Sequence, residues 1–176
     1  MNSDHGPFRL KYPVGRPDPR FAKRDIMTSS VSTVTTPLTT GTWAIDPVHS
    51  SVGFSVRHLM VSKVRGQFDT FSGAITVAED GTPSVHAEIA VNSVNTRNEQ
   101  RDAHLKAADF TDAETYPVAT FASTAVRADG DHYVLDGDFT LRGVTRAVSL
   151  DLEFNGVNPG MGHGAVAGFE ASVVLN

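Results

Sequence analysis

Apolar and polar residues alternate with a period of two through most of this chain, from Trp43 to Leu175. Because successive side chains of a strand point to opposite faces of a sheet, the pattern predicts strands with one apolar and one polar face. About seven or eight segments of this kind are separated by turn residues. The clearest runs are Val52–His58, Phe71–Val77, Val85–Val91, Ala119–Ala125, Tyr133–Leu141, Val148–Phe154 and Ala167–Leu175.

Strands with one apolar face must bury those faces against each other, either in a sandwich or in a closed barrel. Closure also removes exposed strand edges. The side chains predicted to face inward mix Phe with small residues, among them Gly73, Ala87 and Gly137. Small inward residues leave volume that other side chains do not fill, so we predict an all-β chain with an interior cavity.

Two features interrupt the alternation. The apolar phase slips near Asp69 and Thr70, which predicts a β-bulge or a sharp bend. The residues from Thr96 to Glu99 match a capping box, and residues 99–108 contain no Gly, Pro or β-branched residue. We therefore expect one short helix there, capped by Thr96, and an irregular loop over residues 109–117.

The first 40 residues show no hydrophobic period. Residues 1–26 are rich in Pro with mixed charge, and residues 27–40 are rich in Ser and Thr. Such composition cannot bury enough apolar area to offset chain entropy. We predict a disordered tail over residues 1–40 and a single domain over residues 41–176, and Met27 is then a candidate translation start.

Composition and charge exclude several function classes. The net charge of -5, without a cluster of Lys and Arg in the sequence, argues against a nucleic-acid partner. The absence of Cys removes disulfides, thiolate metal sites and a Cys nucleophile. Residues 1–40 lack the apolar core of a secretory signal, and no stretch approaches the roughly 20 apolar residues of a spanning helix. We expect a cytoplasmic protein with at most transient membrane contact.

Seven further sequence elements follow one another in a fixed order: Trp43–Ser50, Phe54–His58, Gly66–Gly73, Ser93–Thr96, Arg101–Leu105, Tyr116–Pro117 and Phe139–Thr145. Together, these elements resemble the YceI-like polyisoprenoid-binding family. The resemblance implies an up-and-down, lipocalin-like barrel of eight antiparallel strands with a helix beside it, often dimeric, that holds a polyisoprenoid chain in its pore. Members of the family continue past the Leu-Asn element into an Arg-x-Asp-Phe-Gly stretch, whereas this sequence stops at Asn176. That difference predicts a barrel incompletely closed at its C-terminal edge.

The predicted ligand site combines this resemblance with the strand parity. Residues on the apolar faces are candidates for the pore lining: Phe54, Val56, His58, Phe68, Phe71, Phe121, Phe139, Leu141, Leu152, Phe154 and Phe169. Arg101 and His104, on the predicted helix, are candidates to meet a polar or phosphorylated head group. The alternative is that Arg101 and Asp102 only fix the helix to the barrel by hydrogen bonds, and that His58 is a satisfied interior side chain.

We predict that the protein binds, sequesters or transports a long-chain isoprenoid lipid of polyprenyl or quinone type, without catalysis and without a cofactor. One alternative is a hydrolase or isomerase that acts on an apolar substrate in the same cavity through His58, His104 or Asp102. Another is an interaction module that uses the outer sheet. The sequence has no His-Glu-x-x-His pair and no Gly-x-Ser-x-Gly elbow, so neither a metal site nor a serine triad is expected. The resemblance adds a homodimer as an expected partner.

Overall fold

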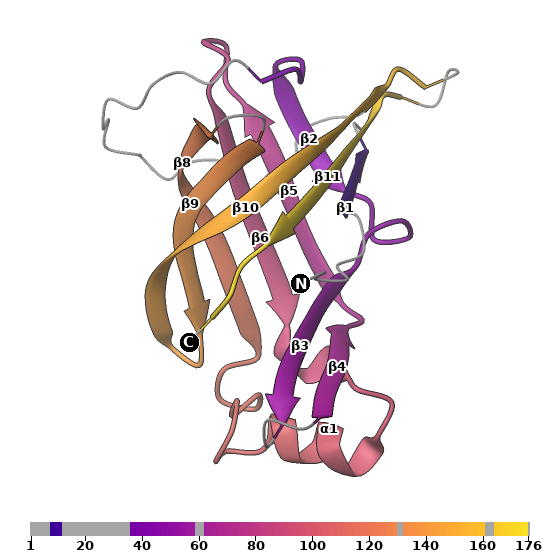
Figure 1. Ribbon diagram of the computed structural model, residues 1–176, viewed down its shortest axis with the longest axis vertical. Coiled ribbons are helices and arrows are strands. Elements are labelled where there is room, and N and C mark those ends of the chain that lie inside the picture. The colour runs from indigo at the N-terminus through magenta and orange to yellow at the C-terminus, as the bar shows by residue number, and fades with distance from the viewer. Residues whose placement is uncertain (1–7, 12–35, 59–61, 130–131, 161–163, 176) are drawn as a thin grey trace.

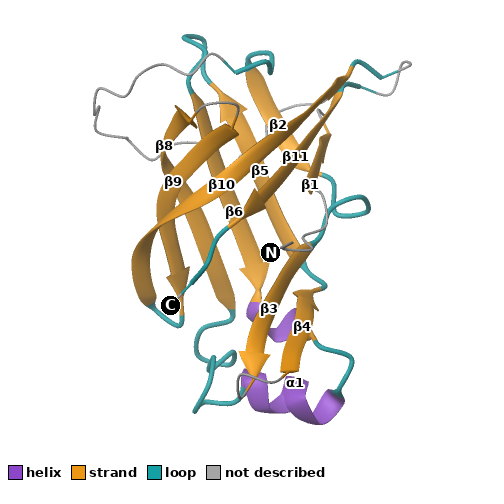
Figure 2. Ribbon diagram, in the orientation of Figure 1, coloured by secondary structure: helices purple, strands orange, loops and turns teal. Residues whose placement is uncertain are grey.

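The computed structural model describes residues 8–11, 36–58, 62–129, 132–160 and 164–175. An antiparallel barrel forms most of the molecule, and a small sheet and one helix lie together at one end of it (Figure 1). Strands dominate and the helix is confined to that end, as Figure 2 shows. The predicted all-β fold with one short helix is confirmed.

The barrel has eight strands, each antiparallel to its neighbours. In order around the ring they are β1 (Phe8–Lys11), β11 (Val166–Ser172), β10 (Val144–Asn158), β9 (His132–Leu141), β8 (Val118–Asp129), β6 (Pro83–Ala90), β5 (Phe71–Val77) and β2 (Gly41–Ile45). Register pairs such as Phe121 with Phe139 and Phe154 with Phe169 bring aromatic side chains of neighbouring strands onto one face.

A second sheet lies outside the barrel and contains β3 (Val52–His58), β4 (Ser62–Phe68) and β7 (Val94–Asn95). The slip in apolar phase at Asp69 and Thr70 marks the point where the chain leaves this sheet and enters the barrel. Two hydrogen bonds fix this corner, since the Asp69 amide donates to the Ser93 carbonyl over 3.1 Å and the Thr70 amide donates to Ser93 Oγ over 3.0 Å. The predicted bend is therefore a change of sheet.

The helix α1 spans Glu99–Lys106, close to the predicted range, and follows β7 and the short 3-10 helix η2 (Val91–Ser93). Its N-cap is Asn98, whose side chain accepts a hydrogen bond from the Arg101 amide. The prediction that Thr96 caps the helix is therefore wrong. Asn is as good a cap as Thr, and here it lies one residue before the helix. Within the described residues no helix is long and apolar enough to cross a bilayer.

Residues 8–11 and 36–40 differ from the predicted tail. β1 pairs with Val166 to Phe169 of β11 and, through Leu10 and Lys11, with β2. The prediction that residues 1–40 contribute nothing to the fold is wrong at these positions, because a four-residue strand fills the space between two barrel edges. The rest of the predicted tail, with Met27, lies outside the described residues.

The seam between β2 and β11 is closed by β1 rather than by a C-terminal extension. Because β1 pairs with β11 only as far as Phe169, residues 170–172 have no strand partner on that side within the described part of the chain. The predicted weak edge at the C-terminal strand is thus covered over half its length.

The barrel interior holds two clusters of buried apolar side chains. One contains Leu38, Trp43, Val77, Ala167 and Phe169. The other, toward the end that carries α1, is built by Val91, Ala113 and Ala119 with Ile89, Phe139 and Leu141 packed against it.

The small inward residues do not open the cavity that the sequence suggested. A Cβ at Gly137 would lie 2.5 Å from Cζ of Phe121, and one at Gly73 would lie 2.5 Å from the His86 carbonyl oxygen. Both glycines therefore allow neighbouring groups to approach closely, and the interpretation of these positions as empty volume is wrong.

Candidate functional site

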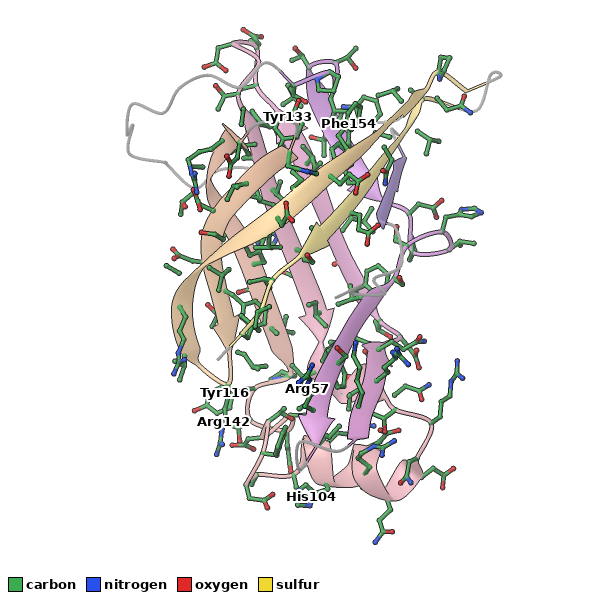
Figure 3. The ribbon with its side chains drawn as sticks, viewed as in Figure 1. Arg57, His104, Tyr116, Tyr133, Arg142 and Phe154 are labelled. Atoms are coloured by element: carbon green, nitrogen blue, oxygen red, sulfur yellow. The ribbon has the colours of Figure 1, made fainter. Side chains whose placement is uncertain are left out.

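An apolar cavity lies inside the barrel at the end away from α1. Its position is marked in Figure 3 by Tyr133 and Phe154, while His104 of α1 lies at the opposite end. The wall consists of Thr36, Pro37, Leu38, Ile75, Pro83, Val85, Val126, Tyr133, Leu135, Leu152, Phe154 and Phe169. Almost all of this wall is carbon, so the site offers burial of apolar surface and little hydrogen bonding.

Alternating strand residues build the cavity wall. Phe154 of β10 and Phe169 of β11 are direct register partners, and their ring centroids lie 5.1 Å apart. Leu135 of β9 is only 3% exposed and lies on the same inward parity as Tyr133. These side chains come from adjacent strands, so the sheet register fixes their relative positions.

The segment of residues 36–38 closes one side of the cavity. Leu38 is 6% exposed and packs in the cluster that contains Trp43 and Phe169. The Leu38 amide donates to Thr36 Oγ1 over 3.2 Å, and Trp43 Nε1 donates to the Thr39 carbonyl over 3.0 Å. An apolar side chain and a few hydrogen bonds thus hold this segment, which belongs to no strand.

The cavity is small, with a volume of about 40 Å³. A water molecule occupies about 30 Å³ of liquid, and a cavity of about 150 Å³ is known to hold benzene. With Leu38 in place, this cavity is therefore too small for an isoprenoid chain.

A second, polar hollow lies between β7 and the start of α1, at the opposite end of the molecule. It has a volume of about 500 Å³ and is lined by Asp69, Asn92, Ser93, Val94, Asn95, Arg97, Asn98, Glu99, Asp102 and Lys106. Side-chain hydrogen bonds from Gln67 (2.6 Å) and Asn95 (2.9 Å) lower the pKa of Asp69. Its carboxylate is therefore an acceptor satisfied within the protein, and no cluster of metal-binding side chains occurs among the residues that the structure describes.

The sequence also matches a known family. A family model described as a YceI-like domain matches residues 43–176. The chain belongs to the YceI-like family.

Two curated relatives illustrate the extent of the match. Protein YceI of Escherichia coli O157:H7 is 40% identical over 125 residues, which cover 70% of this chain and 65% of the relative. The UPF0312 protein plu2095 of Photorhabdus laumondii is 40% identical over 126 residues, covering 70% of this chain and 66% of the relative. The match thus spans about two thirds of the length of these relatives.

Solved structures agree with the fold. The YCEI protein of Campylobacter jejuni is 34% identical, with a TM-score of 0.57 over 70% of this chain and 74% of that protein. BcnA of Burkholderia cenocepacia, at 22% identity, has a TM-score of 0.60 over 72% of this chain and 96% of that protein, and supports the fold alone.

In this YceI-like chain, three of the predicted pore residues line the apolar cavity: Leu152, Phe154 and Phe169. Phe121 is 8% exposed and fills the space above Gly137 within the barrel wall. The other predicted barrel residues lie on β5 or near the α1 end. Phe71 is half-buried on β5, and Phe139 and Leu141 pack against the cluster around Val91.

The residues predicted on β3 and β4 are not brought to the cavity. Phe54 and Phe68 belong to the three-stranded sheet and lie against each other, with ring centroids 5.6 Å apart. Val56 is 56% exposed. The backbone of His58 pairs with Ser62, and its side chain lies outside the described part of the structure.

Arg101 and His104 lie on α1, far from the apolar cavity (Figure 3). Arg101 donates from Nε to Thr96 Oγ1 over 2.7 Å and from a terminal nitrogen to the Thr96 carbonyl over 2.9 Å. Asp102 accepts from the amide and hydroxyl of the same Thr96, which is only 6% exposed. His104 is exposed, with its ring 6.2 Å from that of Phe110. These hydrogen bonds fix the helix, as the alternative interpretation expected, but they join it to Thr96 after β7 of the small sheet rather than to the barrel.

Sequence reasoning missed part of the cavity wall. Three of the missed residues, Tyr133, Leu135 and Val85, lie on the apolar face that the alternation of their strands predicts. The alternation was therefore sufficient to identify them as candidate pore residues. Thr36, Pro37 and Leu38 had no local signal, because their role depends on packing against strands distant in the sequence.

Proposed function

We propose that this protein binds the chain of a long isoprenoid lipid in the apolar cavity and acts as a carrier or store rather than a catalyst. The observation that carries the proposal is the cavity wall, which strands β5, β6, β8, β9, β10 and β11 build almost entirely from carbon. The resemblance to polyisoprenoid-binding proteins supports the same ligand class. A lipid of polyprenyl or quinone type fits such a wall because it needs burial and few polar contacts.

Binding requires the segment of residues 36–38 to move, because Leu38 occupies the space next to the 40 Å³ cavity. Exposing one buried Leu side chain costs about 1.5–3 kcal/mol. One isoprene unit of five carbons contributes about 4 kcal/mol on transfer from water, at about 0.8 kcal/mol per carbon. One or two units therefore offset the displacement of Leu38.

The free energy of transfer is different when the lipid starts in a membrane. The chain is then already in an apolar phase, so moving it into the barrel gains little hydrophobic free energy. Uptake and release are then close to reversible, which suits a carrier.

An enzyme in the same cavity is less well supported. General acid–base catalysis needs a titratable side chain within hydrogen-bond reach of the reacting atoms. Asp102 and His104, two of the three candidates from the sequence, lie at the opposite end of the molecule (Figure 3).

The homodimer stays a prediction, which the mass of the native protein in solution checks.

Organic extraction of the purified protein followed by mass spectrometry tests the proposal. We expect a stoichiometric isoprenoid lipid in the wild-type extract and a large loss in Val126→Trp, which fills the cavity from its wall. Val48→Trp, at a position 80% exposed in the loop after β2, is the matched control and keeps the lipid. An empty wild-type extract, or equal lipid in both variants, contradicts cavity binding. A ligand that is chemically altered during incubation points to the enzyme instead.

A further inference from the structure

Three cations share one face of the β3–β4 hairpin. The register places Arg57 directly opposite Lys63, and Arg65 opposite Ser55. Directly opposed residues lie on the same face of a sheet, as do residues two apart on one strand, so Arg57, Lys63 and Arg65 all point to one side. All three are exposed. The sequence has no basic run here, and it is the strand pairing that brings the charges together.

The strand positions of this basic face include no acidic residue, and one carboxylate contacts its edge, that of Asp69, which accepts a hydrogen bond from Gln67 over 2.6 Å. The remaining members of the face, Gly53, Ser55 and Gln67, are uncharged, and no salt bridge within the described part of the chain neutralises the three cations. Like charges directly opposite each other disfavour the pairing of the strands. In a protein of net charge -5, such a cluster is not a by-product of basic composition. These three cations therefore attract a negatively charged surface locally.

Exposed apolar side chains gather at the same end of the molecule. They surround the β9–β10 turn and the loop after α1: Phe110 is 52% exposed, Tyr116 37%, Val118 44% and Val144 57%. Tyr116 and Arg57 both lie at this end in Figure 3. We call these four residues the apolar rim.

The apolar rim is held in place by the fold. Arg142 donates to the Phe110 carbonyl over 2.9 Å and to the Ala108 carbonyl over 2.7 Å, which ties the loop after α1 to the β9–β10 turn. The ring of Tyr116 packs over Gly143, where a Cβ would lie only 2.8 Å from it. The rim is therefore presented by a fixed structure, and its four side chains are exposed within the part of the chain that the structure describes.

We propose that this end of the barrel docks on a membrane surface that contains anionic lipids. The cations of the hairpin meet the head groups, and the rim enters the interfacial layer, where Tyr and aliphatic side chains are favourably placed. A patch that combines exposed apolar groups with unpaired cations fits a bilayer surface better than a purely acidic partner, which offers nothing to the rim. The inference rests on the proposed function, because a carrier of a membrane lipid must meet the membrane.

Sedimentation of the full chain with vesicles tests the docking. We compare vesicles of phosphatidylcholine alone with vesicles of equal parts phosphatidylcholine and phosphatidylglycerol, both without isoprenoid. Wild-type protein should bind only the anionic vesicles, and less at high salt. The double variant Lys63→Gln with Arg65→Gln should partition about 30-fold less, the equivalent of about 1 kcal/mol for each cation near an anionic surface.

A charge-matched control separates local from global charge. Thr82→Asp with Asn158→Asp lowers the net charge by the same two units as the glutamine pair. Both control sites are exposed and lie outside the hairpin and the rim. This control should bind like wild type. Val144→Ser should weaken binding, while Val157→Ser, at an exposed Val outside the rim, should not. Melting temperatures close to wild type confirm that each variant is folded.

Several outcomes would overturn the docking. Wild-type protein that ignores anionic vesicles refutes it, as does an equal loss in the charge-matched control. The glutamine pair could also leave vesicle binding unchanged and abolish binding of an acidic protein. In that case the basic face binds the protein and not the membrane. Because the vesicles contain no isoprenoid, their binding is independent of ligand binding. Lipid in the extract without vesicle binding refutes the docking alone. Vesicle binding with an empty extract refutes the proposed function alone.

Discussion

Replacing Leu38 by Ala tests whether the segment of residues 36–38 occupies the space that the ligand needs. Leu38 is 6% exposed and packs against Trp43 and Phe169, next to the apolar cavity. The substitution removes three carbons from this packing without changing a hydrogen bond, because the Leu38 contact to Thr36 is made by its backbone amide. It should therefore destabilise the empty protein and favour the bound one.

The magnitude follows from burial and void volume. Three carbons at about 0.8 kcal/mol each give a loss of about 2.4 kcal/mol. Unfilled volume adds about 24 cal/mol per Å³, so each further void the size of the present cavity, 40 Å³, adds about 1 kcal/mol. We expect Leu38→Ala to lower the free energy of unfolding by about 3 kcal/mol. Added polyprenol at 100 times its Kd should restore about 2.7 kcal/mol.

Urea unfolding monitored by Trp43 fluorescence measures both effects, because Trp43 is the only tryptophan and is 1% exposed. Leu175→Ala is the matched control. Leu175 is 57% exposed, so this variant should lose less than about 1 kcal/mol. A loss below about 0.5 kcal/mol in Leu38→Ala would refute the packing of this segment in the barrel. A full loss without tighter polyprenol binding than wild type would refute its role in occupying the ligand space.

Three further predictions concern packing, charge and the helix. Gly73→Ala should cost about 1–3 kcal/mol in urea unfolding, because the new Cβ would lie 2.5 Å from a carbonyl oxygen of β6, whereas Gly53→Ala, with its nearest atom at 3.6 Å, should cost much less; equal costs would contradict the close approach. The hydrogen bonds from Arg127 and then Ser149 hold the pKa of Asp136 below its usual value, so its carboxylate stabilises the fold above pH about 4 and this contribution is lost as the pH falls through the lowered pKa. Stability curves of wild type and Asp136→Asn should therefore converge in acid, and curves that stay parallel would argue against the ion pair. Arg101→Leu should speed amide hydrogen exchange in α1 while leaving bound lipid unchanged, and a loss of lipid with an intact helix would restore the head-group role that the sequence suggested.

The strands could be predicted from the sequence because each needs only its own alternation. β9 and β10 follow the predicted apolar parity, and β8 follows it as far as Ser123. A register shift after Ser123 then turns Val126 toward the cavity in place of the predicted Ala125. Parity identifies the apolar face of a strand but not the sheet to which the strand belongs. For that reason Phe54 and Phe68 were assigned to the pore, although β3 and β4 form a separate sheet.

The closing strand and the inner side of the cavity could not be predicted locally. β1 has four residues between prolines, and Leu38 lies in a Ser- and Thr-rich stretch. Both are fixed by contacts with strands more than 100 residues away, such as β11, and no local composition reports such pairing. The helix could be predicted, because the absence of Gly, Pro and β-branched residues over residues 99–108 is visible in the local sequence. Its cap was missed because Thr96 and Asn98 are both good N-cap residues.

Photocrosslinking with an isoprenoid alcohol that carries a diazirine near the end of its chain tests the central claim most directly. The protein is labelled, digested and analysed by mass spectrometry to identify the modified residues. We predict labels on residues of the cavity wall, with Leu152, Phe154 and Phe169 among the modified positions, and competition by unlabelled polyprenol. Labels confined to β3, β4 and α1, or labelling that unlabelled polyprenol does not reduce, would contradict ligand binding inside the barrel.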